Sequence, residues 1–407
     1  MPRTYVPVRT GWAFGVVAFF FVILILHNSR RLAASGSLLQ FPTKVKAPET
    51  QGQDRLLDDI YNSTLGFEKI MVVSLPSRTD RRDGMVLQSA LTHMSIDFID
   101  GLSGSAVPEK AIPKIENMGH IVDAELGSWR GHMNAIQEVI RQNLSSALIM
   151  EDDADWDIRL KEQLRGVALA TRALTQPLIG YPDAYADPTY PKPANKSASV
   201  VTEIPFEKLP RTEPPKISPY GDDWDVFWIG HCGQTFPHND NLELPKGRVI
   251  RHKDVTVPEK KHLESLYIKP FVLKNDYPDH TRAVHHSQWG TCTLGYAISQ
   301  RGARNILFQL GLKGANAPFD LMLRAFCDGE PGRGKNKCLT TQPSLMEHYR
   351  PVGPYKDESD IKSGVEGFRT EGETKMIRWS VRLNTEKLIK GEPDLIDKYP
   401  DAEEKKE

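Results

Sequence analysis

Apolar runs alternate with helix-like segments along the first half of the chain. The run at Phe67–Leu75 stops at a proline, which is typical of a buried strand. A helical pattern covers Arg81–Met94, and a second short strand is predicted at Ile96–Asp100. A longer amphipathic helix is expected over Ala124–Gln142, before a buried strand at Ala147–Met150. This alternation predicts an α/β fold with a mostly parallel sheet.

The pattern is interrupted in the middle of the chain and then resumes. Ten of the 29 prolines fall within residues 177–219, which predicts a surface insertion or loop rather than core. Further strands are predicted at Asp225–Gly230 and Thr293–Ser299, and a helix is predicted at Gly302–Leu310. Residues 394–407 are dominated by charge and are expected to form a disordered tail.

The N-terminal region holds a long apolar run without charge, from Gly11 to Leu26. As a helix with its flanks it would be about 27 Å long, close to the thickness of early secretory membranes. We expect residues 1–10 to be a cytosolic tail, 11–27 a signal-anchor helix and 28–66 a stem. A cleaved signal peptide is the alternative, because Ala33–Ser37 could supply a cleavage site. Arginines on both sides leave the orientation undecided by charge alone.

The composition agrees with a lumenal location for the folded part of the chain and argues against nucleic acid as a partner. The four cysteines could pair in an oxidising compartment, and Cys327 with Cys338 is the expected bridge. Three N-x-[ST] patterns also fit a lumenal location: Asn62, Asn143 and Asn195. Lys+Arg total 52 against 53 Asp+Glu, so the chain has no basic excess with which to bind nucleic acid. We expect a single-pass type II protein of the Golgi or ER membrane, with residues 67–393 in the lumen.

An acidic cluster follows directly after the predicted strand at Ala147–Met150. Adjacent carboxylates repel one another unless a cation lies among them or they point into water. Alternation along an extended segment would place Glu151 and Asp153 on one side, as an oxygen clamp for Mg²⁺ or Mn²⁺. The alternative is a solvated acidic loop in which Asp155 and Asp157 cap the next helix. The residues alone leave both interpretations open.

Six blocks in this order along the chain resemble glycosyltransferase family 25, the lipooligosaccharide-type and collagen-type β-galactosyltransferases. They are Met71–Arg82, Glu125–Ile136, Leu148–Ala154, Leu294–Leu307, Ala317–Leu323 and Thr340–Tyr349. The chain departs from the family pattern at Ser128, where the family usually has Cys, and at Gly131, where it usually has Ser. The resemblance implies a glycosyltransferase A-type fold, a Rossmann-like mixed sheet flanked by helices, in a fungal-style type II membrane member.

The resemblance also implies an activity and a donor site. The expected reaction is inverting transfer of a sugar, with galactose favoured, from a UDP-sugar to a glycan or glycoprotein acceptor. Glu151 and Asp153 would hold Mn²⁺ or Mg²⁺, which neutralises the leaving diphosphate. Asp152 would contact the ribose or sugar of the donor. Three arginines could grip the diphosphate or the nucleotide base: Arg78, Arg81 and Arg82.

Three further residues receive roles from the matched blocks. Glu125 and His132 lie seven residues apart on one predicted helix and so on about the same face. Glu125 is assigned to donor binding, and His132 is expected to bond to the donor or the acidic loop rather than to act as the base. Asp320 is the best-matched carboxylate for the general base, and it could equally cap the helix at Leu321–Phe326.

Two other interpretations were weighed. A zinc site would have to use histidines and cysteines whose spacings fit no common zinc pattern: His231, His285, His286, Cys232 and Cys292. The rival of a different class is a lumenal, non-catalytic binding or scaffold protein that keeps the glycosyltransferase fold. The intact acidic cluster favours the enzyme, whereas the departures near His132 leave room for the rival.

Overall fold

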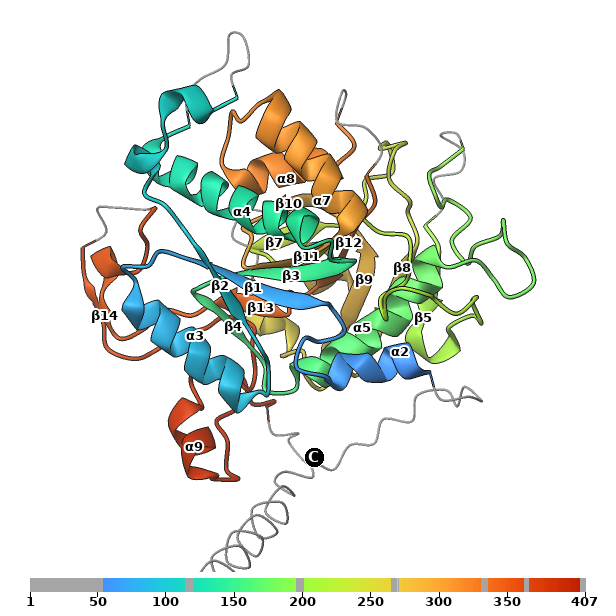
Figure 1. Cartoon of the computed structure of the whole chain (residues 1–407). Helices are drawn as coiled ribbons and strands as arrows, with labels where there is room; N and C mark the ends of the chain where they lie inside the picture. The colour runs from blue at the N-terminus through green and yellow to red at the C-terminus, as the bar shows by residue number, and fades with distance from the viewer. Residues whose placement is uncertain are drawn as a thin grey trace, which may run out of the picture.

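The computed structural model describes residues 54–113, 121–194, 201–264, 269, 271–330, 336–361 and 366–402 (Figure 1). Its centre is an 11-stranded sheet. Along the main path the strands are β2 (Asp97–Asp100), β1 (Lys69–Ser74), β3 (Ser146–Glu151), β11 (Gly295–Ser299), β6 (Val226–Gly230), β12 (Cys338–Gln342), β9 (Arg282–His286), β8 (Arg248–Arg251) and β5 (Glu203–Pro205). Off this path, β13 (Met346–His348) pairs with β6 and with β4 (Ala154–Trp156).

The sheet is mixed rather than mostly parallel. β1 pairs in parallel with both β2 and β3, as the strand–helix–strand pattern predicted. β11 then runs antiparallel between β3 and β6, and β9 is antiparallel to both of its neighbours. The mostly parallel arrangement is therefore wrong, while the mixed α/β fold that fits a glycosyltransferase A-type architecture is observed. Local periodicity could not reveal strand direction, because direction depends on how distant segments pair.

Helices cover both faces of the sheet (Figure 1). They are α2 (Arg55–Asp58), α3 (Thr79–Leu91), α4 (Asp123–Arg141), α5 (Leu160–Thr175), α6 (Val272–Asp276), α7 (Gln300–Ile306), α8 (Phe319–Cys327) and α9 (Thr385–Lys390), and a π-helical turn at Leu307–Lys313 continues α7. Alternation along β3 sends Ile149 into the core with α4, α7 and α8, and Leu148 into the core with α5. Because both faces of the strand are buried, its sequence is an unbroken apolar run.

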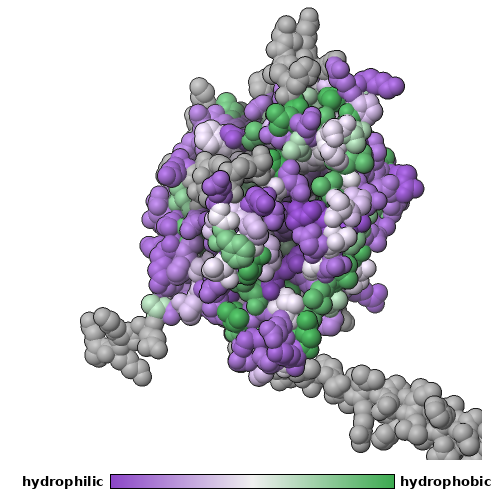
Figure 2. All heavy atoms as spheres, turned by 90° about the vertical axis from the view of Figure 1, so that its left-hand side faces the viewer, coloured by the Kyte–Doolittle hydropathy of each residue, from purple (hydrophilic) through white to green (hydrophobic). Residues whose placement is uncertain are grey.

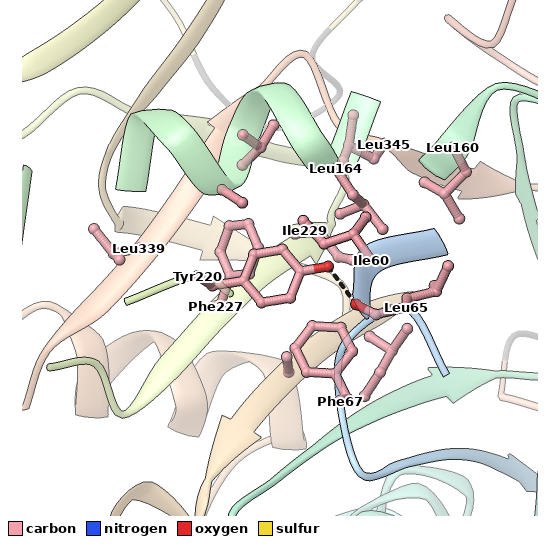
Figure 3. Close-up of a cluster of buried hydrophobic side chains, with 14 of the residues drawn as sticks. Ile60, Leu65, Phe67, Leu160, Leu164, Tyr220, Phe227, Ile229, Leu339 and Leu345 are labelled. Atoms are coloured by element: carbon pink, nitrogen blue, oxygen red, sulfur yellow. Dashed lines mark hydrogen bonds between the residues drawn. The ribbon is translucent and has the colours of Figure 1, made fainter. Parts of the chain in front are cut away.

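Figure 3 shows the core on the α5 side. Leu160 and Leu164 of α5 belong to the same buried cluster as the aromatic side chains of Phe67, Tyr220 and Phe227. Tyr220 is fully buried, and its hydroxyl donates a hydrogen bond of 2.7 Å to the carbonyl of Leu65. This bond satisfies a phenol that would otherwise be costly to bury.

Four short strands complete the fold. β10 (Gln288–Thr291) pairs antiparallel with β7 (Gly233–Thr235), and β14 (Gly353–Pro354) pairs antiparallel with β15 (Phe368–Arg369). The predicted bridge between Cys327 and Cys338 is confirmed, and the other two cysteines, Cys232 and Cys292, form a second disulfide.

Three predicted boundaries need correction. The stem was expected to reach residue 66, but Leu57 and Ile60 are buried in the main core. The proline-rich stretch is not all surface loop, because it supplies the edge strand β5 and the buried Phe206. The tail was expected to be disordered, yet Asp397 pairs with the buried Arg378 at 2.5 Å. In each case a long-range contact, invisible to local composition, holds the segment.

The predicted signal-anchor at 11–27 lies outside the described residues, as do Asn195 and residues 403–407. Among the residues that are described, no helix is both long enough and apolar enough to cross a bilayer.

Candidate metal and donor site

The acidic cluster lies where β3 ends and β4 and β13 begin to pair. Glu151 is the last residue of β3, and Asp153 precedes β4. β13 runs antiparallel to β4 and sets His348 opposite Ala154. One ligand atom each from Glu151, Asp153 and His348 lies within 4.8 Å of the others. The predicted alternation of Glu151 and Asp153 toward one side agrees with this geometry, and His348 joins them as a third possible ligand.

The chemistry of the cluster fits a divalent cation. Asp153 Oδ1 is buried and has no hydrogen-bond partner among the described residues, while Oδ2 accepts from Arg350 Nη1 at 2.9 Å. The three carboxylates, Glu151 to Asp153, face two guanidinium groups, those of Arg81 and Arg350. The local balance is one net negative charge, which a bound cation would offset. Two carboxylates and an imidazole suit Mn²⁺ better than a wholly oxygen-preferring ion.

The surrounding charges control the ionisation of the cluster. Burial alone would raise the pKa of Asp153, but His348, Arg81 and Arg350 outweigh it and lower that pKa to about 2. Burial also opposes the ionisation of Glu151, yet the contact with His132 holds its pKa below the ordinary value. Both possible ligand carboxylates are therefore negatively charged at neutral pH, as a metal site requires.

Glu151 is held from the α4 side of the sheet. Its Oε1 accepts a hydrogen bond of 2.6 Å from Thr293 Oγ1 and lies 3.5 Å from His132 Nε2. The His132 ring is buried, bonds through Nδ1 to the Tyr296 hydroxyl at 3.1 Å, and stacks on Phe319 at 4.3 Å. His132 thus lies against the acidic cluster, where its packed ring can orient Glu151 but is not free to receive a proton from a substrate.

Arg81 is the predicted arginine that reaches the cluster. It extends from the first turn of α3, and its Nη1 donates to Asp152 Oδ1 at 2.7 Å and lies 3.9 Å from Asp153. Its Nη2 donates to the backbone carbonyl of Glu358 at 2.6 Å. Burial raises the pKa of Asp152, and Arg81 only partly offsets this effect. Arg81 thus pairs with Asp152 and lies beside Asp153 through the same nitrogen.

The other two predicted arginines lie farther out. Arg78 donates to Asp80 at 2.8 Å and to Asp360 at 2.5 Å, so it ties the start of α3 to a C-terminal loop. Arg82 donates to Asp100 at 2.5 Å and to the Ser74 carbonyl at 2.9 Å. Arg82 therefore bridges the ends of β1 and β2, next to the cluster but not in contact with Glu151 or Asp153.

The side of the molecule that carries α3 and β14 is shown in Figure 2. It is mainly hydrophilic, with a hollow lined by hydrophilic residues near its middle. Arginines on this side form ion pairs with neighbouring carboxylates, and these charged side chains explain the hydrophilic surface.

Two predicted residues are not brought to the cluster. Glu125 lies in the first turn of α4, about 10 Å along the helix axis from His132. Asp320 lies in the first turn of α8, where its Oδ2 accepts from the backbone N–H of Cys292 and its Oδ1 from that of Leu321, both at 2.9 Å. Asp320 is the second residue of α8, whose N-cap is Pro318 without a side-chain bond, so the helix-cap alternative is wrong and the general-base role stays a prediction.

The alternative interpretation, a solvated acidic loop whose carboxylates cap the next helix, is wrong for the second half of the run, because Asp155 and Asp157 are both buried. Asp155 accepts from Gln88 at 3.1 Å and from Ser380 at 2.5 Å, and it is fully buried. Asp157 accepts from the backbone N–H of Arg159 at 2.9 Å, just before α5 begins. Asp155 therefore joins distant segments and Asp157 holds the turn before α5, whereas Glu151 and Asp153 bring ligand atoms within 4.8 Å of each other.

The proposed zinc ligands do not form a metal group. His231 Nε2 bonds to the carbonyl of Thr341 at 2.9 Å, and His285 Nδ1 bonds to that of His286 at 2.7 Å. The cysteines that the zinc hypothesis would need are joined as the Cys232–Cys292 disulfide. Within the described part of the chain, the acidic cluster is the group with metal-ligand geometry.

One family departure has a packing explanation. A Cβ atom at Gly131 would lie 2.7 Å from Val73 Cγ1, so glycine permits α4 to approach β1 closely. A serine there would force the helix or Val73 to move. The departure therefore reflects helix–strand packing and leaves the neighbouring His132 on the cluster.

Sequence reasoning missed three residues of the site: His348, Arg350 and Thr293. All three fall in or next to blocks that were matched, but none follows an acidic run or carries a motif of its own. A weak signal was available, since His348 lies within the matched block Thr340–Tyr349 and Arg350 directly follows it.

Comparison with known proteins relates part of the chain to one glycosyltransferase family. Residues 67–177 match the model of glycosyltransferase family 25 (LPS biosynthesis protein). The chain is 25% identical over 254 residues to procollagen galactosyltransferase 1 of Danio rerio, a match that covers 60% of this chain and 29% of the relative. It is 25% identical over 326 residues to procollagen galactosyltransferase 1-B of Xenopus laevis, covering 77% of this chain and 39% of the relative.

Another relative carries a different description. The chain is 21% identical over 280 residues to the probable inactive glycosyltransferase 25 family member 3 of Bos taurus, covering 66% of this chain and 33% of the relative. In all three comparisons the match spans well under half of the relative's length. Residues 67–177 are thus similar to glycosyltransferase family 25, and this matched segment includes β1, α3, α4 and the acidic cluster at the end of β3.

Proposed function

We propose that the chain is a metal-dependent, inverting glycosyltransferase that uses a UDP-sugar, with galactose favoured, and a glycan or glycoprotein acceptor. The observation that carries the proposal is the convergence of Glu151, Asp153 and His348, with the buried Asp153 Oδ1 left unpartnered among the described residues. The galactosyltransferases among the similar proteins support the choice of sugar.

Each group around the cluster has a distinct task in this proposal. A bound Mn²⁺ or Mg²⁺ would supply Lewis-acid neutralisation of the leaving diphosphate. Arg81 and Arg350 lie beside the same carboxylates and can donate to phosphate oxygens. His132 and Thr293 orient Glu151 from the buried side. Asp152, paired with Arg81, fixes the arginine next to the donor.

The acceptor is placed next to an exposed tryptophan. Trp289 is 41% exposed, lies over the Arg324 guanidinium, and has its backbone N–H held by Asp328 at 2.9 Å. It is four residues before Thr293, so their Cα atoms are at most about 14 Å apart. An aromatic ring at this distance could stack on an acceptor sugar while the reacting hydroxyl reaches the cluster.

Localisation forms part of the proposal. The apolar run at 11–27 would anchor the chain in the Golgi or ER membrane, with the described domain in the lumen. The two disulfides support an oxidising compartment.

UDP release from a panel of UDP-sugars tests the activity, with Mn²⁺ or with EDTA. We expect one sugar, galactose foremost, to give metal-dependent release that Asp153→Ala abolishes. Trp289→Ala should raise the acceptor KM and leave donor hydrolysis unchanged.

The second candidate is a non-catalytic protein that keeps the fold, favoured by the relative described as probably inactive. It predicts that well-folded protein binds UDP and Mn²⁺ but releases no UDP from any sugar. Absence of both binding and turnover would reject the UDP-sugar proposal altogether.

A further inference from the structure

The disulfide between Cys232 and Cys292 lies between the two sides of the candidate metal site. It joins the turn between β6 and β7 to the turn between β10 and β11, which are 60 residues apart in sequence. Its Cα atoms are 5.4 Å apart, and Cys232 is 5% exposed. The disulfide therefore restrains two segments of the chain. One contacts the possible ligand His348, and the other leads to Thr293, which bonds to the possible ligand Glu151.

The Cys232 end contacts His348. Cys232 Sγ is 3.9 Å from His348 Nδ1. A divalent sulfur is a weak hydrogen-bond acceptor, and metal-bound histidines commonly donate their second ring N–H to a neighbouring acceptor. The contact therefore restrains the imidazole ring of His348 where it lies beside Glu151 and Asp153.

The Cys292 end leads to Glu151. The backbone N–H of Cys292 donates to Asp320 Oδ2 at 2.9 Å, and its carbonyl accepts from Trp228 Nε1 at 3.0 Å. Cys292 has φ of +60°, which is unusual for a residue with a side chain and requires restraint from its surroundings. The next residue, Thr293, donates to Glu151 Oε1 at 2.6 Å.

We infer that the Cys232–Cys292 disulfide is a positioning element of the metal site, which orients His348 from one end and, through Thr293, Glu151 from the other. This inference rests on the proposed function. Without the bond, the Cys292 turn is free to relax from its restrained conformation, and the two ligands lose their fixed separation. The carboxylates and the imidazole remain present, so metal binding is weakened rather than abolished.

The second disulfide supplies a matched control. Cys327 and Cys338 join the end of α8 to the start of β12, both are fully buried, and they belong to the core under α4. The experiment compares C232S/C292S with C327S/C338S by calorimetric titration of the purified full-length protein with Mn²⁺ alone. Circular dichroism and thermal unfolding of both variants report folding separately.

We expect C232S/C292S to bind Mn²⁺ at least 10-fold more weakly than the wild type, and C327S/C338S to stay within about 3-fold. Equal affinities in the two folded variants would overturn the inference while leaving the metal site intact. A wild type that binds no Mn²⁺ would instead overturn the metal site of the proposed function, and the positioning role with it.

A second measurement does not require the first variant to fold. In C327S/C338S the remaining disulfide is Cys232–Cys292, since the chain has four cysteines. Reducing this folded variant with a thiol, and removing the thiol under inert gas before titration, should weaken Mn²⁺ binding at least 10-fold. Reoxidation should restore the affinity. Unchanged affinity in the reduced protein would contradict the inference.

Discussion

Two buried polar clusters of this protein hold groups that can ligate a metal, and they differ in where those groups point. In the acidic cluster, ligand atoms of Glu151, Asp153 and His348 converge within 4.8 Å. In the histidine cluster around His231 and His285, ring nitrogens bond instead to backbone carbonyls. Residue type therefore does not make a metal site. A metal site requires that the lone pairs of several ligand atoms converge, and this convergence depends on how strands from distant parts of the chain pair.

The surroundings favour the charged form of Asp153 in the acidic cluster and the neutral form of His231 in the histidine cluster. Cationic neighbours outweigh burial at Asp153 and lower its pKa to about 2, so the carboxylate keeps its charge. Burial dominates at His231 and lowers its pKa to about 4, so the imidazole stays neutral. The first cluster is suited to hold a cation, and the second is a neutral part of the hydrogen-bonded interior.

The largest expected effect is at the acidic cluster. Asp153→Asn removes a charged ligand and leaves an amide of nearly the same size, so metal-dependent UDP release should fall about 1,000-fold, or about 4 kcal/mol of transition-state stabilisation. Initial rates with saturating Mn²⁺ measure this. The control is Asp97→Asn, which alters an exposed carboxylate of β2 and should keep wild-type turnover. Equal turnover in both variants would contradict the assignment of Asp153.

The histidine cluster should instead control acid stability. The folded pKa of His231 lies below its ordinary value of 6.5, so protons bind to the unfolded chain first as the pH falls. The contribution of a neutral His231 is fully present above pH 6.5 and is lost between pH 6.5 and about 4. The loss should reach about 3 kcal/mol at the lower limit, at about 1.4 kcal/mol per pH unit.

Denaturant unfolding at pH 7 and pH 4.5 measures this effect. His231→Gln can keep a donor toward the Thr341 carbonyl and should lose less stability between the two pH values than the wild type does. His93→Asn changes an exposed histidine with φ of +54° and should retain the wild-type pH dependence. Identical pH dependence in all three proteins would show that His231 is not a source of acid sensitivity.

The smallest expected effects come from removing the hydroxyl group of two buried threonines. One hydroxyl bonds to Glu151 of the acidic cluster, and the other bonds to a backbone carbonyl away from the cluster. Thr293→Val removes the hydrogen bond to Glu151 and should weaken Mn²⁺ binding about 10-fold. Thr340→Val removes a bond to the carbonyl of Trp228 and should cost about 1 kcal/mol of stability with no change in Mn²⁺ affinity. Calorimetry and unfolding on both variants give the comparison, and a loss of metal affinity in Thr340→Val would remove the distinction.

The local pattern of apolar and polar residues was sufficient to locate the main helices and strands around the site. The predicted strand at Ala147–Met150 is β3, extended by one residue at each end, and the predicted helix at Ala124–Gln142 is α4 within one residue. The matched block Thr340–Tyr349 is divided between β12 and β13 by a turn that contains a cis peptide bond before Pro343. Periodicity reports which positions are buried, so it locates elements well and leaves turns and strand direction undetermined.

The amino-acid sequence by itself determined the elements around the site, the alternation that puts Glu151 and Asp153 on one side, and the bridge between Cys327 and Cys338. These features depend on residues that are close together in the chain. The tertiary structure alone decided that His348 completes the cluster, and that Arg350, which is 197 residues from Asp153, neutralises part of its charge. It also decided that Asp155 and Asp157 are structural. The physical reason is that a carboxylate becomes a ligand or a structural acceptor according to which groups the folded chain brings to it, and here the pairing of β13 with β4 brings His348 to the cluster.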